Sequence, residues 1–182
     1  MRIRSNKGFT LIELLLVVAI IGIIAAIASP GLLRARMSGN EASAIGSLRA
    51  INSSQAAFSS SCANGFYATK LTDLYLAPPS GTPFISPDLG ASATVTKSGF
   101  SVTMVGTAPT SVATIPACNT VAVGLLMGGY YSNADPTSFN STGTRYFWSN
   151  TLGTIYQDTS ATIAFTSGTT APTPTATLVP LQ

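Results

Sequence analysis

The feature that most constrains this chain is an apolar run near its N-terminus, from Phe9 to Ala28, in which only Thr10 and Glu13 are strongly polar. Twenty helical residues at about 1.5 Å each span roughly 30 Å, the thickness of the hydrocarbon core of a bilayer. The run therefore predicts a membrane-spanning helix. Three basic residues precede it, and the positive-inside rule keeps that end in the cytoplasm.

Glu13 is the only acid inside this run. A carboxylate there costs roughly 2.5–3.5 kcal/mol on insertion scales, so it needs a partner. Alternatively, it snorkels or is protonated in lipid; a proton relay is disfavoured because the run contains no second acid. We expect Glu13 in the second helical turn, where the helix dipole favours a negative charge.

Gly22 and Pro30 interrupt the helical pattern. Glycine lowers helix propensity by about 1 kcal/mol relative to alanine. Proline removes the hydrogen bond to the residue four positions back, which predicts a kink or local melting near Ala26. We interpret both as points of helix flexibility, with a static kink as the alternative.

The basic leader 1–8, the Gly8–Phe9 junction and Glu13 together resemble the prepilin signal of type IV pilins and type II secretion pseudopilins. The resemblance implies that a membrane aspartyl prepilin peptidase cuts between Gly8 and Phe9, and that the new Phe9 amine is methylated. It also implies that Glu13 pairs with the terminal amine of Phe9 on a neighbouring subunit, which sets the register of assembly. An ordinary secretory signal does not fit, because its apolar region precedes the cut.

Residues 9–30 would then form a transmembrane and filament-core helix, and residues 31–61 its amphipathic continuation. In the second part, apolar side chains and one glutamine recur every three or four residues, which predicts packing against a sheet. The members of this stripe are Ile45, Leu48, Ile51, Gln55 and Phe58. Cys62 and Cys118 follow the helix. If this part is exported they can form a disulfide; the alternative is two buried free thiols.

Residues 62–166 are expected to form a globular β head, and the Thr/Pro-rich residues 167–182 a flexible tail without a core role. Alternating patterns predict hairpins over 93–105 and 144–157, a strand over 120–127 and an edge strand over 162–165. Residues 133–136 are predicted to form a turn. The expected fold class is α+β: a long N-terminal α-helix packed on a small antiparallel sheet of about four strands.

Charge and composition exclude several functions. Three of the nine basic residues lie in the leader, so the remaining six balance the six acids, and no nucleic-acid partner is expected. The chain has no histidine and no P-loop motif, which removes histidine triads, the usual zinc sites and nucleotide hydrolysis. We therefore predict no enzyme activity, no cofactor and no metal.

Two weaker signals remain in the head. Asp135 and Asp158 are candidate calcium ligands, but two isolated acids do not make an oxygen cage. Five aromatic side chains could stack on a sugar or a single nucleic-acid strand, and core or subunit-contact roles are the preferred interpretation. These are Tyr130, Tyr146, Phe147, Trp148 and Tyr156.

The resemblance implies a structural subunit that is stored in the inner membrane, N-terminus cytoplasmic, and polymerises with copies of itself into an extracellular type IV pilus. Its partners would be prepilin peptidase and an inner-membrane assembly platform whose motors use ATP. The alternatives are the major pseudopilin of a type II secretion system, which forms a periplasmic pseudopilus, and a minor adhesive or DNA-uptake pilin.

Overall fold

A computed structural model describes residues 8–110 and 116–181 of the chain. The chain divides into two compact units, Met1–Arg36 and Met37–Gln182. Helix α1, Leu11–Ser61, begins in the first unit and ends in the second. The other elements, which all belong to the second unit, are β1 (Tyr67–Ala68), α2 (Leu71–Tyr75), α3 (Pro87–Gly90), β2 (Thr94–Lys97), β3 (Phe100–Thr110), the 3-10 helix η1 (Val123–Leu125), β4 (Leu126–Pro136), β5 (Tyr146–Asn150), β6 (Ile155–Asp158) and β7 (Val179–Leu181).

In the first unit, the helical backbone continues through Pro30. The local melting predicted near Ala26 is therefore not seen, and helix flexibility at Gly22 and Pro30 stays a prediction. The apolar side chains of this unit are exposed: Phe9, for example, is 77% exposed and Leu11 79%. By length and composition, α1 is able to cross a membrane.

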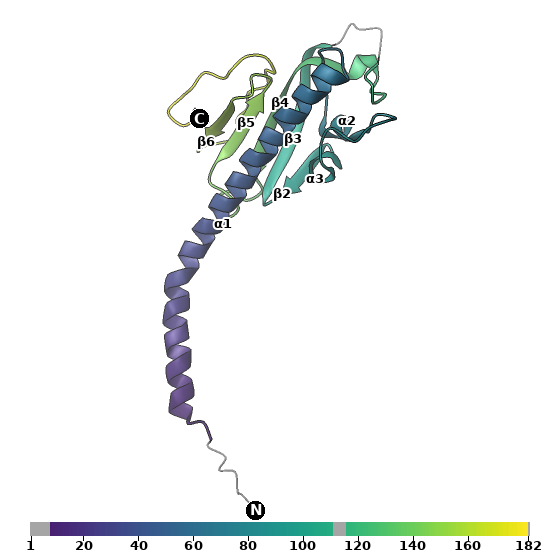
Figure 1. Ribbon diagram of the computed structural model, residues 1–182. Helices are drawn as coiled ribbons and strands as arrows, with labels where there is room; N and C mark the ends of the chain where they lie inside the picture. Colours follow the sequence, from purple (N-terminus) through teal and green to yellow (C-terminus); the bar gives the residue numbers. More distant parts are fainter. Residues whose placement is uncertain (1–7, 111–115, 182) are drawn as a thin grey trace, which may run out of the picture. The chain divides into compact units, whose positions relative to one another are not determined.

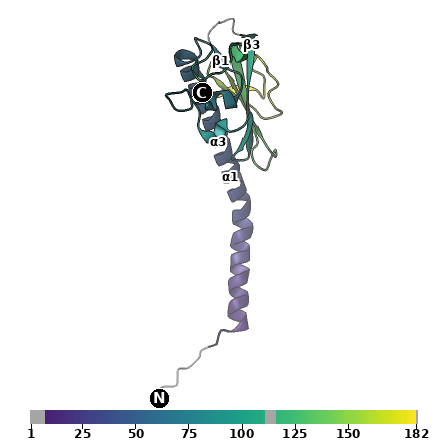
Figure 2. The same ribbon diagram turned by 90° about the vertical axis from the view of Figure 1, so that its right-hand side faces the viewer.

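The second unit is built on a seven-stranded antiparallel sheet in the order β2-β3-β4-β5-β6-β7, with β1 paired to β4. The C-terminal part of α1 lies across one face of this sheet (Figures 1 and 2). Leu48, Ile51 and Phe58 of α1 are fully buried in one core cluster with side chains from the sheet, including Phe100 and Phe147. The amphipathic stripe therefore packs as predicted, and the α+β fold class is confirmed.

Gln55, the polar member of the stripe, forms the hydrogen bonds to β1 that a neighbouring strand would otherwise form. Its side chain is fully buried. Its amide nitrogen donates to the carbonyl of Ala68 at 2.9 Å, and the backbone N–H of Ala68 donates to its amide oxygen at 3.0 Å. Gln55 thus satisfies both backbone groups of a residue in the two-residue strand β1, which has few partners of its own.

The strand predictions were right for the two hairpins and wrong elsewhere. The region 120–125 is not a strand, and β4 begins only at Leu126. The predicted turn at 133–136 is the end of β4, where Asp135 pairs with Ser101 of β3. The predicted edge strand at 162–165 is also absent. The sheet has seven strands rather than about four, and β1 and β7, which join it through long-range pairing, were not predicted.

The C-terminal segment contributes to the core, although residues 167–182 were predicted to form a flexible tail without a core role. Strand β7 pairs with β6. Leu178 is buried in a second apolar cluster with Trp148, Tyr156 and Ile163. The side-chain amide of Asn150 in β5 donates to the carbonyl of Thr170 at 2.7 Å. The expectation that residues 167–182 contribute nothing to the core is therefore wrong. Part of this segment packs against Trp148 of β5 and Tyr156 of β6 and shields them from solvent.

Candidate functional site: the helix start and the head clamp

The first candidate site is the start of α1. Helix α1 begins at Leu11, so Thr10 is the N-cap residue and Glu13 lies in the first turn rather than the second. The Thr10 backbone N–H donates to a Glu13 carboxylate oxygen at 3.0 Å, and the Thr10 hydroxyl donates to the same oxygen at 2.6 Å. The Glu13 N–H donates back to the Thr10 hydroxyl at 3.3 Å. This reciprocal pattern is a capping box.

The capping box has a consequence for Glu13. Its carboxylate is held at the helix N-terminus, where the helix dipole favours negative charge. One carboxylate oxygen accepts both bonds from Thr10, so the other oxygen is available to a further donor. The motif Thr10-x-x-Glu13 is legible in the sequence, and the sequence analysis missed it. Gly8 and Phe9 precede the helix in non-helical backbone.

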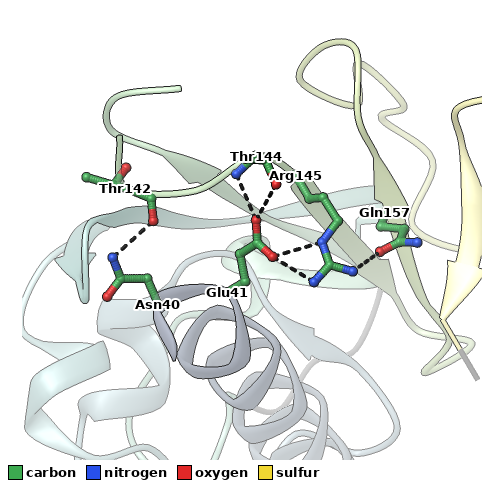
Figure 3. A network of polar contacts seen from close by, with 6 residues as sticks. All are labelled: Asn40, Glu41, Thr142, Thr144, Arg145 and Gln157. Carbon is green, nitrogen blue, oxygen red and sulfur yellow. Dashed lines mark hydrogen bonds and ion pairs between the residues drawn. The ribbon is translucent and has the colours of Figure 1, made fainter. Parts of the chain in front are cut away.

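The second candidate site is a clamp between α1 and the sheet, shown in Figure 3. Glu41 of α1 is 4% exposed. One of its carboxylate oxygens accepts bonds from the Thr144 N–H at 2.7 Å and the Thr144 hydroxyl at 2.9 Å. The other accepts from the Arg145 guanidinium, from Nε at 2.9 Å and from Nη2 at 2.6 Å. We call this set of residues, with Asn40 and Gln157 below, the head clamp.

Two further bonds complete the head clamp. The remaining Arg145 nitrogen Nη1 donates to Gln157 of β6 at 2.6 Å, and Asn40 of α1 donates to the Thr142 carbonyl at 3.0 Å. Burial acts to raise the pKa of Glu41, but the bonds from Thr144 and Arg145 outweigh it and lower that pKa below its ordinary value. Glu41 is therefore a buried, ionised and fully satisfied carboxylate.

No sequence pattern pointed to a contact between Glu41 and Arg145, so the head clamp was not predicted. A weak signal was present: Glu41 is seven residues before Leu48, two helical turns away on the same buried face. The head clamp also bears on the DNA-uptake alternative, because arginine side chains are typical phosphate ligands. The Arg145 guanidinium is already engaged by Glu41 and Gln157, so it is not a free phosphate ligand.

The two cysteines are joined. Cys62 and Cys118 form a disulfide across a sequence separation of 56 residues. It ties the end of α1 to the loop before η1, and the Cys118 N–H also donates to the Cys62 carbonyl at 3.0 Å. The alternative of two free thiols does not hold in this structure.

The calcium and stacking alternatives find no support in the geometry. Asp135 lies on β4 and Asp158 on β6, with β5 between them, and the described residues include no group of three or more metal-binding side chains. Four of the five aromatic candidates are buried as core members, as preferred: Tyr130, Phe147, Trp148 and Tyr156. The fifth, Tyr146, is partly exposed and stacks on Phe139.

Comparison with known proteins finds one family model and two similar pilins. The family model of the prokaryotic N-terminal methylation motif matches residues 3–29. The chain is similar to the type IV major pilin protein PilA of Myxococcus xanthus, with 47% identity over 53 residues, which are 29% of this chain and 24% of that protein. It is also similar to the type IV wide pilus major component PilA4 of Thermus thermophilus, with 60% identity over 38 residues, which are 21% of this chain and 29% of that protein.

The family model covers only residues 3–29, and the two relatives match 29% and 21% of the chain. The chain spans about a quarter of the length of the curated relatives it matches. No solved structure matches the chain. The N-terminal segment thus carries a prokaryotic methylation motif, and Gly8, Phe9, Thr10 and Glu13 lie within the matched residues.

Proposed function

We propose that this chain, which has the N-terminal segment of a type IV pilin, is a prepilin that is cut, methylated and polymerised into a type IV pilus. The observation that supports this most is the combination of a methylation motif over residues 3–29 with a helix whose apolar side chains are exposed. Large exposed apolar surfaces mark contacts with membranes or with other proteins. A pilin uses one such surface for both, first in the bilayer and then in the filament.

The cut between Gly8 and Phe9 is the step that makes the chain able to assemble. It removes the three leader cations and creates an amine at Phe9, four residues before Glu13. In an apolar filament core, an unpaired carboxylate is strongly disfavoured. The free oxygen of Glu13 accepts the Phe9 ammonium of a neighbouring subunit, so the pair forms only between processed subunits and fixes their register.

Substitution of Gly8 tests the processing step. Gly8→Ala places a side chain where the peptidase needs a close approach to the backbone. We expect this variant to keep residues 1–8 and to remain in the membrane, as read from the mass of the purified chain. Normal processing of the variant would contradict the assignment of the cleavage site.

Substitution of Glu13 tests the assembly step. Glu13→Ala removes the acceptor and should give a processed, membrane-resident subunit whose yield of sheared surface filaments falls at least tenfold. Thr10→Val is a matched control, because it removes the hydroxyl of the capping box and leaves the carboxylate in place. A Glu13→Ala strain with wild-type filaments would exclude the pairing.

The partners follow from the same proposal. Prepilin peptidase acts on the Gly8–Phe9 bond, copies of the chain bind through residues 9–30, and an inner-membrane platform supplies ATP-driven extraction from the bilayer. The type II pseudopilin alternative predicts trapped secreted enzymes, rather than missing surface filaments, in a deletion strain. The function proposed is structural, with no enzymatic step by this chain.

A further inference from the structure

The second unit has a surface pocket between β6 and the C-terminal segment, which we call the Asp158 pocket. Its volume is about 370 Å³, at the small end of the range of ligand pockets, about 300–1,000 Å³. The residues that line it include Asp158, Thr162, Ile163, Phe165, Thr173 and Leu178. Among the described residues that line the pocket, Asp158 is the only charged one. The pocket therefore combines an apolar wall with a single acid.

Asp158 is an acid without a basic partner. Its Oδ1 accepts bonds from the Ser160 N–H and the Ser160 hydroxyl, both at 2.7 Å, so Oδ2 can accept a further donor. Burial acts to raise the pKa of Asp158, but the hydrogen bonds from Ser160 outweigh it and lower that pKa below its ordinary value. The carboxylate is therefore ionised at neutral pH. It belongs to neither of the two ion pairs found among the described residues.

Arg49 is the complementary cation of the second unit. Its side chain is exposed on α1, and it too belongs to neither ion pair of the part of the chain that the structure describes. It lines a pocket of about 190 Å³ together with residues 153–155 and Leu181. Lys70, another exposed cation of this unit, is attracted by the nearby Asp73 carboxylate. Arg49 is therefore the better candidate to seek an acid on another molecule.

Arg49 and Asp158 lie on opposite faces of the sheet, so they cannot pair within one chain. Ile155, beside Arg49, packs in the core cluster under α1, whereas Tyr156 packs in the second apolar cluster. Because side chains alternate along a strand, Asp158 of β6 is on the face of Tyr156, and α1 crosses the other face (Figure 1). A contact between two such different surfaces is heterologous, and it builds an open filament when the rotation does not close.

The Asp158 pocket has the chemistry that an arginine side chain needs. A guanidinium donates two parallel N–H bonds to a carboxylate and lies favourably against an aromatic ring, which Asp158 and Phe165 provide. Its methylene groups can cover apolar side chains such as Ile163 and Leu178. The pocket presents no basic side chain among its described lining residues, so nothing there repels the incoming cation.

We propose that the Asp158 pocket receives the Arg49 side chain of a neighbouring copy of this chain. Each copy then gives Arg49 to one neighbour and accepts the Arg49 of another, and both surfaces belong to the second unit. The inference rests on the proposed function, because a filament is what holds the second units of successive copies in a fixed register. Lys70 of a copy and a basic side chain of another protein are the competing occupants.

The first test removes each charge separately. Asp158→Asn keeps an oxygen for the Ser160 bonds, so we expect an unchanged urea midpoint of the second unit. Asp158→Asn and Arg49→Gln should each lower the yield of sheared filaments roughly fivefold, as for a partly exposed ion pair. Lys70→Gln is the matched control and should keep the wild-type yield. Wild-type yield from Asp158→Asn or Arg49→Gln would overturn the contact, and an equal loss from Lys70→Gln would also do so.

The second test identifies the partner as a copy of the chain. Asp158→Arg and Arg49→Asp each place like charges at every contact, and each alone should lower the filament yield about tenfold or more. Cells that express both variants should recover filaments, because alternating copies again join an acid to a base at each contact. A single chain with both substitutions should recover as well, whereas Asp158→Arg with Lys70→Asp, which has the same net charge, should not.

The outcomes separate this contact from the proposed function. No recovery in the mixed cells, with both variants processed and present in the membrane, would overturn the contact between copies and leave the filament assignment standing. Recovery with Lys70→Asp would assign the pocket to Lys70 and overturn the role of Arg49. Absence of this chain from all surface filaments of the wild type would overturn the proposed function, and the contact with it.

Discussion

The head clamp supports a quantitative prediction for Glu41→Gln. Glutamine has the shape of glutamate, so its oxygen can still accept from Thr144, but its amide would face the Arg145 guanidinium with donor against donor. Removing one member of a buried ion pair costs about 3–5 kcal/mol. The Arg145 side chain is 32% exposed, and water partly compensates for the lost partner. We therefore expect the free energy of unfolding to fall by about 2–3 kcal/mol.

Trp148 provides the assay. It is the only tryptophan of the chain and is fully buried in the head, so its fluorescence reports unfolding of this unit. For the intact protein in detergent micelles, the loss corresponds to a fall of about 1 M in the urea midpoint. Asp88→Asn is the control: its ion pair with Lys97 is exposed at the surface and is worth less than about 1 kcal/mol.

The pH dependence sharpens this prediction. The pKa of Glu41 is lowered in the fold, so the clamp stabilises the head above the ordinary carboxyl pKa and weakens as pH falls through the lowered one. The difference between wild type and Glu41→Gln should therefore shrink in acid. A midpoint shift no larger than that of Asp88→Asn, or one that does not change with pH, would refute the reasoning.

Two more predictions concern the head. The double substitution Cys62→Ser with Cys118→Ser should lower the free energy of unfolding by about 4 kcal/mol in the chain-entropy model; an unchanged urea midpoint would contradict a stabilising role for the disulfide. Burial raises the pKa of Asp135 to about 6, so its contribution to stability is lost as pH rises from the ordinary aspartate range through that value. Because the carboxyl is only partly buried, we expect Asp135→Asn to be more stable than wild type by about 1 kcal/mol at pH 7.5 and equal to it in acid. If the free energy of unfolding of the wild type instead rose with pH over this interval relative to that of Asp135→Asn, the predicted direction would be wrong.

The sequence predicted the parts of the fold that depend on local patterns. Patterns of apolar and polar side chains over short windows predict three of these parts: the apolar run, the stripe ending at Phe58 and the two hairpins. The Ser98–Gly99 turn is one example: both residues have positive φ, at 48° and 72°, as a tight hairpin turn requires. Local chemistry was sufficient in these segments because the hydrogen bonds of a helix and of a hairpin turn join residues that are close in the sequence.

The errors occur where long-range pairing overrides local preference. Residues Asn133 to Pro136 have turn composition, yet they extend β4 because β3 pairs with them. Pro136 is tolerated at the end of the strand, where a missing N–H costs little. Likewise, the Thr/Pro-rich C-terminal segment lacks an apolar period of its own, and Leu178 is buried only because Trp148 and Ile163 lie beneath it.

The candidate sites divide in the same way. Gly8, Phe9 and Glu13 belong to a contiguous motif and were found from the sequence. Glu41 and Arg145 are 104 residues apart, and no pattern in a single sequence joins them. Only the tertiary structure shows that the acid on the buried face of α1 is the anchor of the β4–β5 loop.

The central claim is that cleavage at Gly8 turns a membrane-stored precursor into a subunit that polymerises. Mass spectrometry of the N-terminal peptide from sheared surface filaments tests it most directly. The account predicts that this chain is present in the filaments and begins at an N-methylated Phe9. Filaments built from a chain that still begins at Met1, or that begins at any residue other than Phe9, would contradict it.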